Sequence, residues 1–121
     1  LGAGWVNAWY LAGAGFTEDR TSDVVHKNGG IPGAASMDEL TATVLATLDD
    51  TDSTVTVASS SEASVGEQVV DVFPAEGDDS VRGYRLYVFG QREAGSGPYS
   101  LYAVERTLLC WRGVDPTGLC I

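Results

Sequence analysis

Few side chains in this sequence are suited to chemistry, and the two cysteines are the most informative of them. Cys110 and Cys120 lie ten residues apart near the end of the 121-residue chain. Two thiols on one short segment favour a disulfide, which forms in an oxidising compartment, although a free buried pair in a cytosolic protein is the alternative. The spacing is not that of a CxxC redox or metal motif. We therefore predict a Cys110–Cys120 disulfide and no cofactor.

Acid–base and nucleophilic chemistry have little support. His26 is the only histidine and lies in a polar stretch, so any Ser-His or Cys-His site would depend on it. No nucleophile-elbow motif accompanies a serine. Seventeen carboxylates make acidic pairs inevitable by chance, and a solvated acidic surface accounts for them without glycoside chemistry. We predict no catalytic residue and expect a protein that is not an enzyme.

Metal binding is restricted to calcium. One histidine and two oxidised cysteines cannot build a closed zinc site. Residues 49–53 and 76–79 supply oxygen ligands in loops, but neither stretch has the spacing of an EF-hand. We therefore predict no metal site, and the only calcium candidates are Asp50, Asp52, Asp78 and Asp79.

The charge balance excludes several partners. The formal net charge is −10, and Lys27 is the only lysine. Such a chain repels phosphate backbones and anionic lipid surfaces, so nucleic acid is not an expected partner. An acidic, lysine-poor composition is typical of halophilic proteins, and a GC-rich genome is the alternative explanation.

One amphipathic helix follows from local signals. Ser36 and Glu39 form a capping box in which each side chain satisfies the other residue's backbone amide. Apolar residues then recur at helical spacing, which predicts a helix over about 37–48. The aspartates at 49, 50 and 52 end it, because carboxylates at a helix C-terminus oppose the macrodipole.

A pattern of period two follows the helix and predicts an antiparallel sheet of about four strands. The expected strands cover about 54–57, 66–73, 81–91 and 98–112, with the serine run at 59–61 breaking the pattern after the first. The last two read as a long hairpin, since a short connector with two glycines joins them.

A symmetric hairpin places Leu86 and Val88 on the side that packs against the helix. On the other side it places Tyr87 opposite Tyr102, with Arg85 nearby. Arg85, Tyr87 and Tyr102 are therefore a candidate partner face. Cover by the chain's own N-terminus is the alternative.

Residues 1–16 form an apolar segment without any charged side chain. Sixteen residues are too few for a complete transmembrane helix, which needs about 20. We prefer a helix here, with a strand as the alternative, and we expect residues 17–35 to form a loop with one turn near Val24 and Val25. The segment packs on its own domain, continues a membrane helix, or docks on neighbouring subunits. The docking residues would be Trp5, Val6, Trp9, Tyr10 and Leu11.

The disulfide loop contains a turn signature of its own. Asp115-Pro116-Thr117-Gly118 has proline at the second and glycine at the fourth position, as type I turns favour. The turn brings the two sulfurs together, so the loop acts as a staple on the last strand. A binding loop that displays Trp111 and Arg112 is the alternative.

These elements predict a single α+β domain over 1–121: one helix on an antiparallel sheet, with an apolar N-terminal segment and a C-terminal disulfide loop. The chain opens on Leu1 rather than Met, which we interpret, with the disulfide, as a sign of export to the extracellular space or cell surface. In outline the domain resembles the head of a pilin. The early glutamate of the pilin N-terminus is absent, so no functional residue is transferred.

Two functions from different classes follow, with a small secreted hydrolase as a third. The first is a structural subunit of an extracellular filament, pilus-like fibre, envelope or virion that self-associates, or binds another envelope or virion protein, through residues 1–16. The second is an exported monomeric binding module that uses the aromatic face of the sheet.

Overall fold

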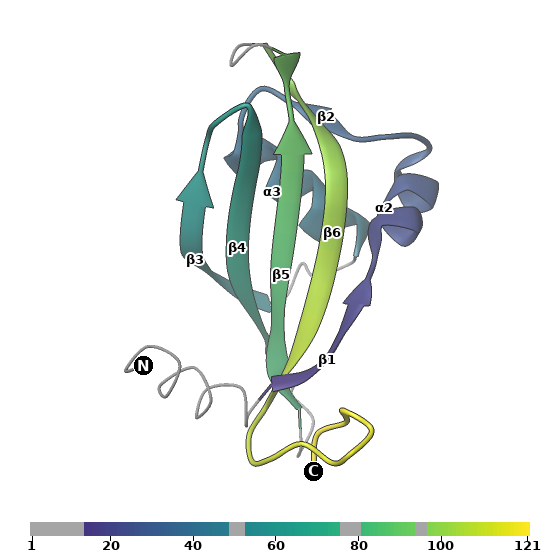
Figure 1. The fold of residues 1–121 in the computed structure, drawn as a ribbon, viewed down its shortest axis with the longest axis vertical. Coiled ribbons are helices and arrows are strands. Elements are labelled where there is room, and N and C mark those ends of the chain that lie inside the picture. The colour runs from purple at the N-terminus through teal and green to yellow at the C-terminus, as the bar shows by residue number, and fades with distance from the viewer. Residues whose placement is uncertain (1–13, 49–52, 76–80, 94–96) are drawn as a thin grey trace.

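The last strand of the chain lies near one edge of a single antiparallel sheet and pairs with strands from both ends of the sequence (Figure 1). The computed structural model describes residues 14–48, 53–75, 81–93 and 97–121. Its elements are β1 (Ala14–Asp19), α2 (Thr21–Asn28), β2 (Gly33–Ala34), α3 (Met37–Thr47), β3 (Ser53–Ser61), β4 (Val65–Pro74), β5 (Val81–Gln91) and β6 (Tyr99–Cys110).

The sheet has six strands rather than about four. The order is β1-β6-β5-β4-β3, and β2 pairs with β6 near the start of that strand. The strands β3 to β6 form a meander, and β1 closes on the far side of β6. The predicted α+β class is confirmed. The additional strands, β1 and β2, have six and two residues and form only because β6 pairs with them, so they leave no local pattern.

The expected loop over 17–35 is wrong, because most of this stretch is regular structure. It contains the end of β1, all of α2 and both residues of β2. Within α2 only Val24 is buried, so the helix carries no apolar stripe that sequence periodicity could detect. The helix ends at Gly29, whose φ of 76° is the left-handed conformation that favours glycine at this position.

The helix α3 confirms the prediction from local signals. It begins at Met37 and ends at Thr47, with Leu48 as its C-cap. The Ser36 hydroxyl accepts a hydrogen bond from the Glu39 amide at 3.2 Å, as a capping box requires. In the reciprocal bond of the capping box, the Glu39 carboxylate accepts from the Ala35 amide at 3.1 Å rather than from the Ser36 amide.

The core lies between the helices and one face of the sheet. Met37, Leu40 and Val44 of α3 are fully buried against valines and leucines of β4, β5 and β6. Tyr99 is also fully buried, and its hydroxyl donates to the Ala63 carbonyl at 2.7 Å. Burial of each large side chain contributes about 1.5 to 3 kcal/mol, so this layer holds α3 on the sheet.

The expected strand at 66–73 is confirmed as β4, that at 81–91 as β5 and that at 98–112 as β6. The first strand is longer than predicted, because the serines at 59–61 continue β3 by pairing with β4 across a register shift between Val57 and Ser59. Cross-strand hydrogen bonds outweigh the weak strand propensity of serine here.

The predicted register of the β5–β6 hairpin is wrong. Tyr87 pairs with Glu105, not Tyr102, and Val88 pairs with Val104. The centre of the hairpin lies further along the chain than the symmetric arrangement predicted. A register shift between Phe89 and Gly90 then moves the pairing of β5 with β6 by one more residue. Leu86 and Val88 nevertheless lie in the core as expected.

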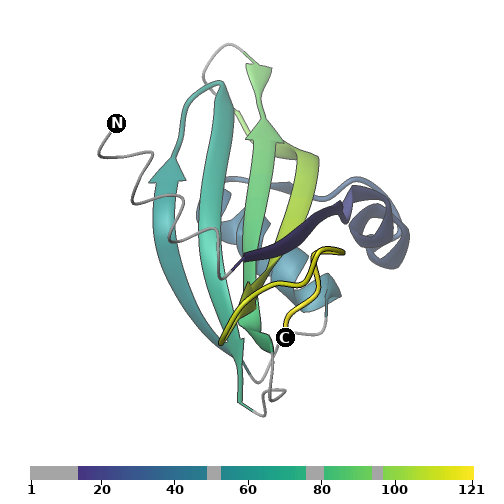
Figure 2. The same cartoon turned by 60° about the horizontal axis from the view of Figure 1, so that its bottom comes forward.

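The two faces of the sheet differ. Both helices lie behind the sheet in Figure 1, and the turned view of Figure 2 agrees. No described helix or strand crosses the opposite face. The described part of the fold is therefore two layers, with one sheet face unoccupied by any described element.

Candidate functional site

The sheet face opposite the helices contains the predicted partner residue Arg85, which is already engaged. Its guanidinium donates two hydrogen bonds to the Asp71 carboxylate on β4, from Nε at 2.6 Å and from Nη2 at 2.9 Å. Arg85 and Asp71 are direct cross-strand partners, and only about a fifth of each side chain is exposed. This bidentate geometry neutralises Arg85 within the protein.

The two tyrosines of the predicted face do not form a pair. Tyr87 lies between Val69 and Glu105 on the neighbouring strands and is half-buried. Tyr102 lies in the stretch of β6 where the register shifts, and 62% of its surface is exposed. The structure therefore places a single exposed tyrosine near the start of β6 rather than an aromatic strip.

The predicted disulfide between Cys110 and Cys120 is confirmed, and the loop it closes is tied by backbone hydrogen bonds. The Cα atoms of the two cysteines are 5.2 Å apart. The Gly118 amide donates to the Asp115 carbonyl at 3.0 Å, which is the bond of the predicted turn. A bridge between Val114 and Cys120 completes a small hairpin. The loop is thus a rigid appendage at the end of β6.

This loop displays apolar side chains at one pole of the molecule, which we call the apolar pole. Its members Trp111, Leu119 and Ile121 are each at least half exposed. The Arg82 guanidinium lies 4.8 Å from the ring centre of Phe73 and 5.6 Å from that of Trp111. An arginine between two rings fixes the orientation of the indole by cation–π attraction.

The N-terminal part of the chain joins the sheet at the apolar pole. Ala14 pairs with Leu109, the residue before Cys110, so β1 begins beside the disulfide loop. Figure 1 shows the start of β1 and the C-terminal loop at the same end of the molecule. The predicted interface residues lie outside the described part of the chain: Trp5, Val6, Trp9, Tyr10 and Leu11. The pairing places Ala14, the first described residue after their segment, at this pole.

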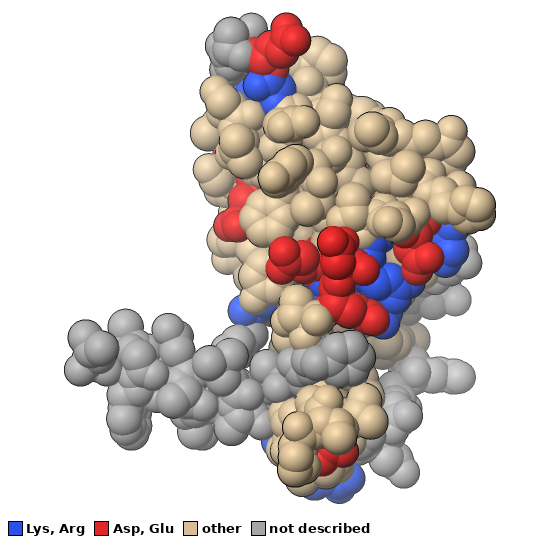
Figure 3. Space-filling model, turned by 45° about the vertical axis from the view of Figure 1, so that its right-hand side comes forward, with Lys and Arg blue, Asp and Glu red and all other residues tan. Residues whose placement is uncertain are grey.

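A cluster of charged side chains lies over β1, β6 and α2 (Figure 3). Glu18 contacts both Arg106, its cross-strand partner, and Arg20, and Arg20 also contacts Asp23. The Arg106 guanidinium lies 5.4 Å from the ring centre of Tyr84. Each of these partly exposed ion pairs contributes little stability. Both Arg20 and Arg106 nevertheless have acidic partners within the protein.

All six arginines contact groups of their own chain. Besides the pairs above, the Arg92 guanidinium lies 4.6 Å from the ring centre of Tyr99, and Arg112 Nε donates to the Ile121 carbonyl at 3.2 Å. Each arginine of the described surface therefore has a contact within its own chain.

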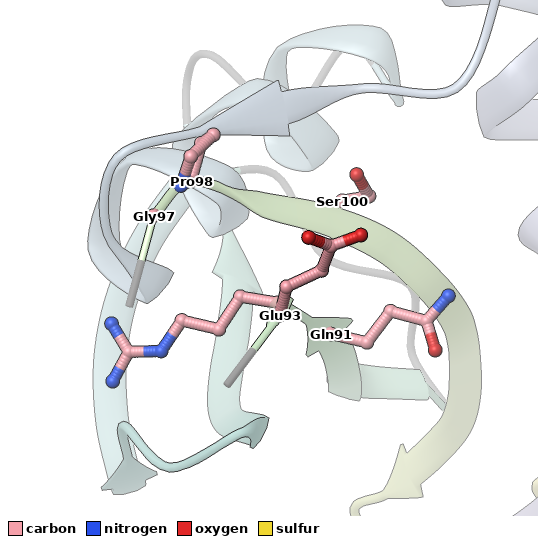
Figure 4. A pocket seen from close by; sticks show the side chains of 6 residues that line it. Gln91, Glu93, Gly97, Pro98 and Ser100 are labelled. Carbon is pink, nitrogen blue, oxygen red and sulfur yellow. The ribbon is translucent and has the colours of Figure 1, made fainter. Parts of the chain in front are cut away.

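A polar hollow lies at the far end of the β5–β6 hairpin (Figure 4). Its volume is about 540 Å³, and it is lined by Gln91, Arg92, Glu93, Gly97, Pro98 and Ser100. Figure 4 shows the Glu93 carboxylate directed toward the side on which Ser100 lies. The lining combines a carboxylate, an amide and a hydroxyl, but this set is not a nucleophile–base pair.

Of the remaining predicted residues, those within the described part of the chain do not assemble into a metal centre. His26 is exposed on α2, and within the described ranges nothing forms a hydrogen bond or ion pair with its imidazole. Those ranges also contain no cluster of three potential metal ligands. The calcium candidates Asp50, Asp52, Asp78 and Asp79 lie outside them. Neither α2 nor α3, the helices that the structure describes, is long and apolar enough to cross a bilayer.

Two exposed aspartates have lowered pKa values, and both organise a turn. A hydrogen bond from the Thr117 hydroxyl lowers the pKa of Asp115, with further help from the Leu119 amide. A hydrogen bond from the Thr21 hydroxyl likewise lowers the pKa of Asp19, followed by one from the Thr21 amide. Both residues belong to an Asp-x-Thr sequence, and in both the carboxylate accepts from the amide and the hydroxyl of the threonine two residues later, as in an Asx turn.

Comparison with known proteins does not identify a relative. No protein family matches this chain, and no similar curated protein or solved structure is found. The assignment of function therefore depends on the geometry above.

Sequence reasoning identified the cysteines and Trp111 but not the apolar pole as a whole. Leu119 and Ile121 look like ordinary apolar residues in the sequence, and their exposure follows only from the way the disulfide holds the loop away from the core. The contact between Arg82, Phe73 and Trp111 joins three separate segments, so no local pattern signals it.

Proposed function

We propose that this protein is a non-enzymatic structural subunit of an extracellular assembly, such as a filament, a pilus-like fibre, an envelope or a virion. It associates through the apolar segment that precedes β1. The observation that carries this proposal is the pairing of Ala14, the first described residue after that segment, with Leu109 beside the loop where Trp111, Leu119 and Ile121 are exposed.

The physical argument is the cost of apolar surface in water. Each square ångström of apolar surface removed from water contributes roughly 25 cal/mol, so three exposed side chains beside a charge-free segment favour burial against another surface. Residues 1–13, which precede Ala14 in the sequence, contain Trp5 and Trp9. Contacts between neighbouring subunits at this pole would cover both sets of residues together.

The disulfide and the charge support an extracellular setting. The Cys110–Cys120 bond requires an oxidising environment, as the outside of a cell provides. The net charge of −10 keeps the body of each subunit soluble and restricts close contact to uncharged surfaces. The exposed side chains of Trp111, Leu119 and Ile121 are uncharged, and Arg82 and Arg112 beside them carry charge opposite to the net charge.

The test uses the full chain beside a variant with Trp5→Ser and Trp9→Ser. We expect the intact protein to form oligomers or fibres, seen by sedimentation velocity and negative-stain electron microscopy. The double variant should form no such higher assemblies and should keep an unchanged circular dichroism spectrum. Tyr102→Ser serves as a matched control, because Tyr102 is exposed near the other end of the sheet. A monomeric intact chain, or full assembly of the double variant, would refute the proposal.

The second candidate is a monomeric binding module that uses the sheet face opposite the helices. The observation that favours it is the absence of any described element over that face, together with the 62% exposure of Tyr102. The Arg85–Asp71 pair weakens it, since a ligand would have to compete with an existing bidentate ion pair. Tyr87→Ser with Tyr102→Ser should abolish partner binding in this case and leave self-association unchanged.

A further inference from the structure

The outer edge of β3 is free of any described strand, and its first five residues lack the usual protection of sheet edges. β3 pairs with β4 on one side only, whereas the outer side of β6 is covered by β1 and β2. The nine residues of β3 include no charged residue and no proline, and all after Ser53 are exposed. Natural proteins usually place lysine, proline or a bulge on such an edge. The single register shift lies beyond Val57, so residues 53–57 stay regular.

The backbone of this regular stretch directs hydrogen-bonding groups outward. The Val72 carbonyl oxygen lies 2.2 Å from the position that a Cβ on Gly83 would take, so it points toward β5. The pair Val55–Val72 is therefore a non-hydrogen-bonded pair of the β3–β4 ladder, and Val55 directs its own amide and carbonyl away from β4. Hydrogen-bonding groups alternate in direction from one residue to the next in an antiparallel ladder, so the amide and carbonyl of Val57 also point away from β4.

The side chains on this edge are self-complementary. Val55 and Val57 are partners of the core residues Val72 and Val70, yet they are 39% and 53% exposed. If a second β3 pairs antiparallel about a two-fold axis at Thr56, each Val55 lies opposite Val57 of the second copy. Both valines on each chain then lose exposed surface to an aliphatic neighbour.

We propose that β3 pairs with β3 of a second copy in this register, which joins two sheets into one across a two-fold axis. The partner is a copy of this chain because the edge pattern is complementary to itself, and because an uncharged strand lets two molecules of net charge −10 approach without direct carboxylate contacts along β3. This interface goes beyond the apolar pole and uses a different surface.

The first test compares two identical substitutions in the full chain. Val57→Lys places a charge on the free edge, whereas Val65→Lys places it at an equally exposed valine, 61% exposed, at the start of β4. With Trp5→Ser and Trp9→Ser also present, to remove association through the N-terminal segment, sedimentation velocity across protein concentration should show a dimer for the chain without a new lysine and for Val65→Lys. Val57→Lys should weaken dimerisation roughly tenfold or more. Equal weakening by both substitutions, or no dimer at any concentration, would overturn the proposal.

The second test reads the register. Thr56 would face Thr56 of the second copy in a non-hydrogen-bonded pair, where Cα atoms lie about 4.5 Å apart, within the range for a disulfide. Thr56→Cys should therefore give a crosslinked dimer under mild oxidation. Thr54→Cys should not, because the two substituted positions lie four residues apart across the axis. Faster crosslinking of Thr54→Cys would overturn the register.

These outcomes are separable from those of the proposed function. The Trp5→Ser and Trp9→Ser variant should still crosslink through Thr56→Cys. Val57→Lys should still associate through the apolar pole into species whose subunits do not crosslink at position 56. Loss of crosslinking in the tryptophan variant would assign the contact to the N-terminal segment instead.

Discussion

Asp115 shows how one side chain determines the shape of the disulfide loop. Its carboxylate accepts hydrogen bonds from the Thr117 amide at 2.9 Å, the Thr117 hydroxyl at 2.6 Å and the Leu119 amide at 3.0 Å. Three donors on one carboxylate oxygen favour the ionised form, which is why the pKa of Asp115 is lowered although the residue is accessible to water. The ionised carboxylate in turn holds the two strands of the loop in register.

Replacement of Thr117 by valine should raise the pKa of Asp115 toward the ordinary value for aspartate. The substitution removes the hydroxyl, which is the largest cause of the shift, and keeps the backbone donors. Carboxyl carbon chemical shifts measured against pH report the change, and Asp19, which has its own threonine, should titrate unchanged. An unaltered Asp115 titration would contradict the assignment of cause.

The lowered pKa also fixes the sign of the pH dependence. Because the folded form of Asp115 binds its proton less readily than the unfolded chain, its contribution to stability is complete above about pH 4, where the unfolded chain is ionised. That contribution is lost as the pH falls through the folded pKa. The protection factors of the loop amides against hydrogen exchange should therefore fall on acidification below that point.

At the scale of elements, the sequence predicted those whose signals are local. The capping box and the apolar spacing placed α3 within one residue, and the change of period to two placed β4 and β5. By contrast, α2 buries only Val24, and β1 and β2 exist because β6 pairs with them, so nothing in their own residues marks them. The hairpin register failed for the same reason, since a register shift is decided by both strands together.

The candidate site follows the same division. The disulfide could be predicted, because its two cysteines lie only ten residues apart in the sequence. The apolar pole could not, because it needs Arg82 from β5, Phe73 from β4 and the start of β1 to meet the loop. The free edge of β3 also needed the sheet order, since the sequence does not say which strand is last.

Removal of the disulfide is the prediction that belongs to this scale. Cys110→Ser with Cys120→Ser should lower the free energy of unfolding by about 2 to 3 kcal/mol, the chain-entropy value for so short a loop. The end of β6 should fray with the start of β1, because Leu109 pairs with Ala14. Urea denaturation measures the change, and reduction of the unmodified protein should reproduce it. A stability equal to that of the oxidised chain would show that the loop hydrogen bonds suffice alone.

At the scale of the whole molecule, charge and association oppose each other. Each chain carries a formal net charge of −10, yet both proposed contact surfaces, the apolar pole and the edge of β3, consist mainly of uncharged side chains. The attraction between two copies is therefore short-ranged, whereas their repulsion acts over the Debye length, about 10 Å in 0.1 M salt and about 3 Å in 1 M salt. Salt should reduce the repulsion and leave the uncharged contacts intact.

Self-association should consequently strengthen as sodium chloride rises from about 0.05 to 1 M. The association constant of the dimer should increase roughly tenfold or more. Sedimentation equilibrium at several salt concentrations measures the trend. The Val57→Lys chain should associate more weakly than the Val65→Lys chain at every salt concentration. Salt screening lets the molecules approach each other, but it does not restore strand pairing at an edge that carries a lysine. Association that weakens with salt would instead indicate opposite charges across the contact, and would exclude an uncharged β3 edge as its centre.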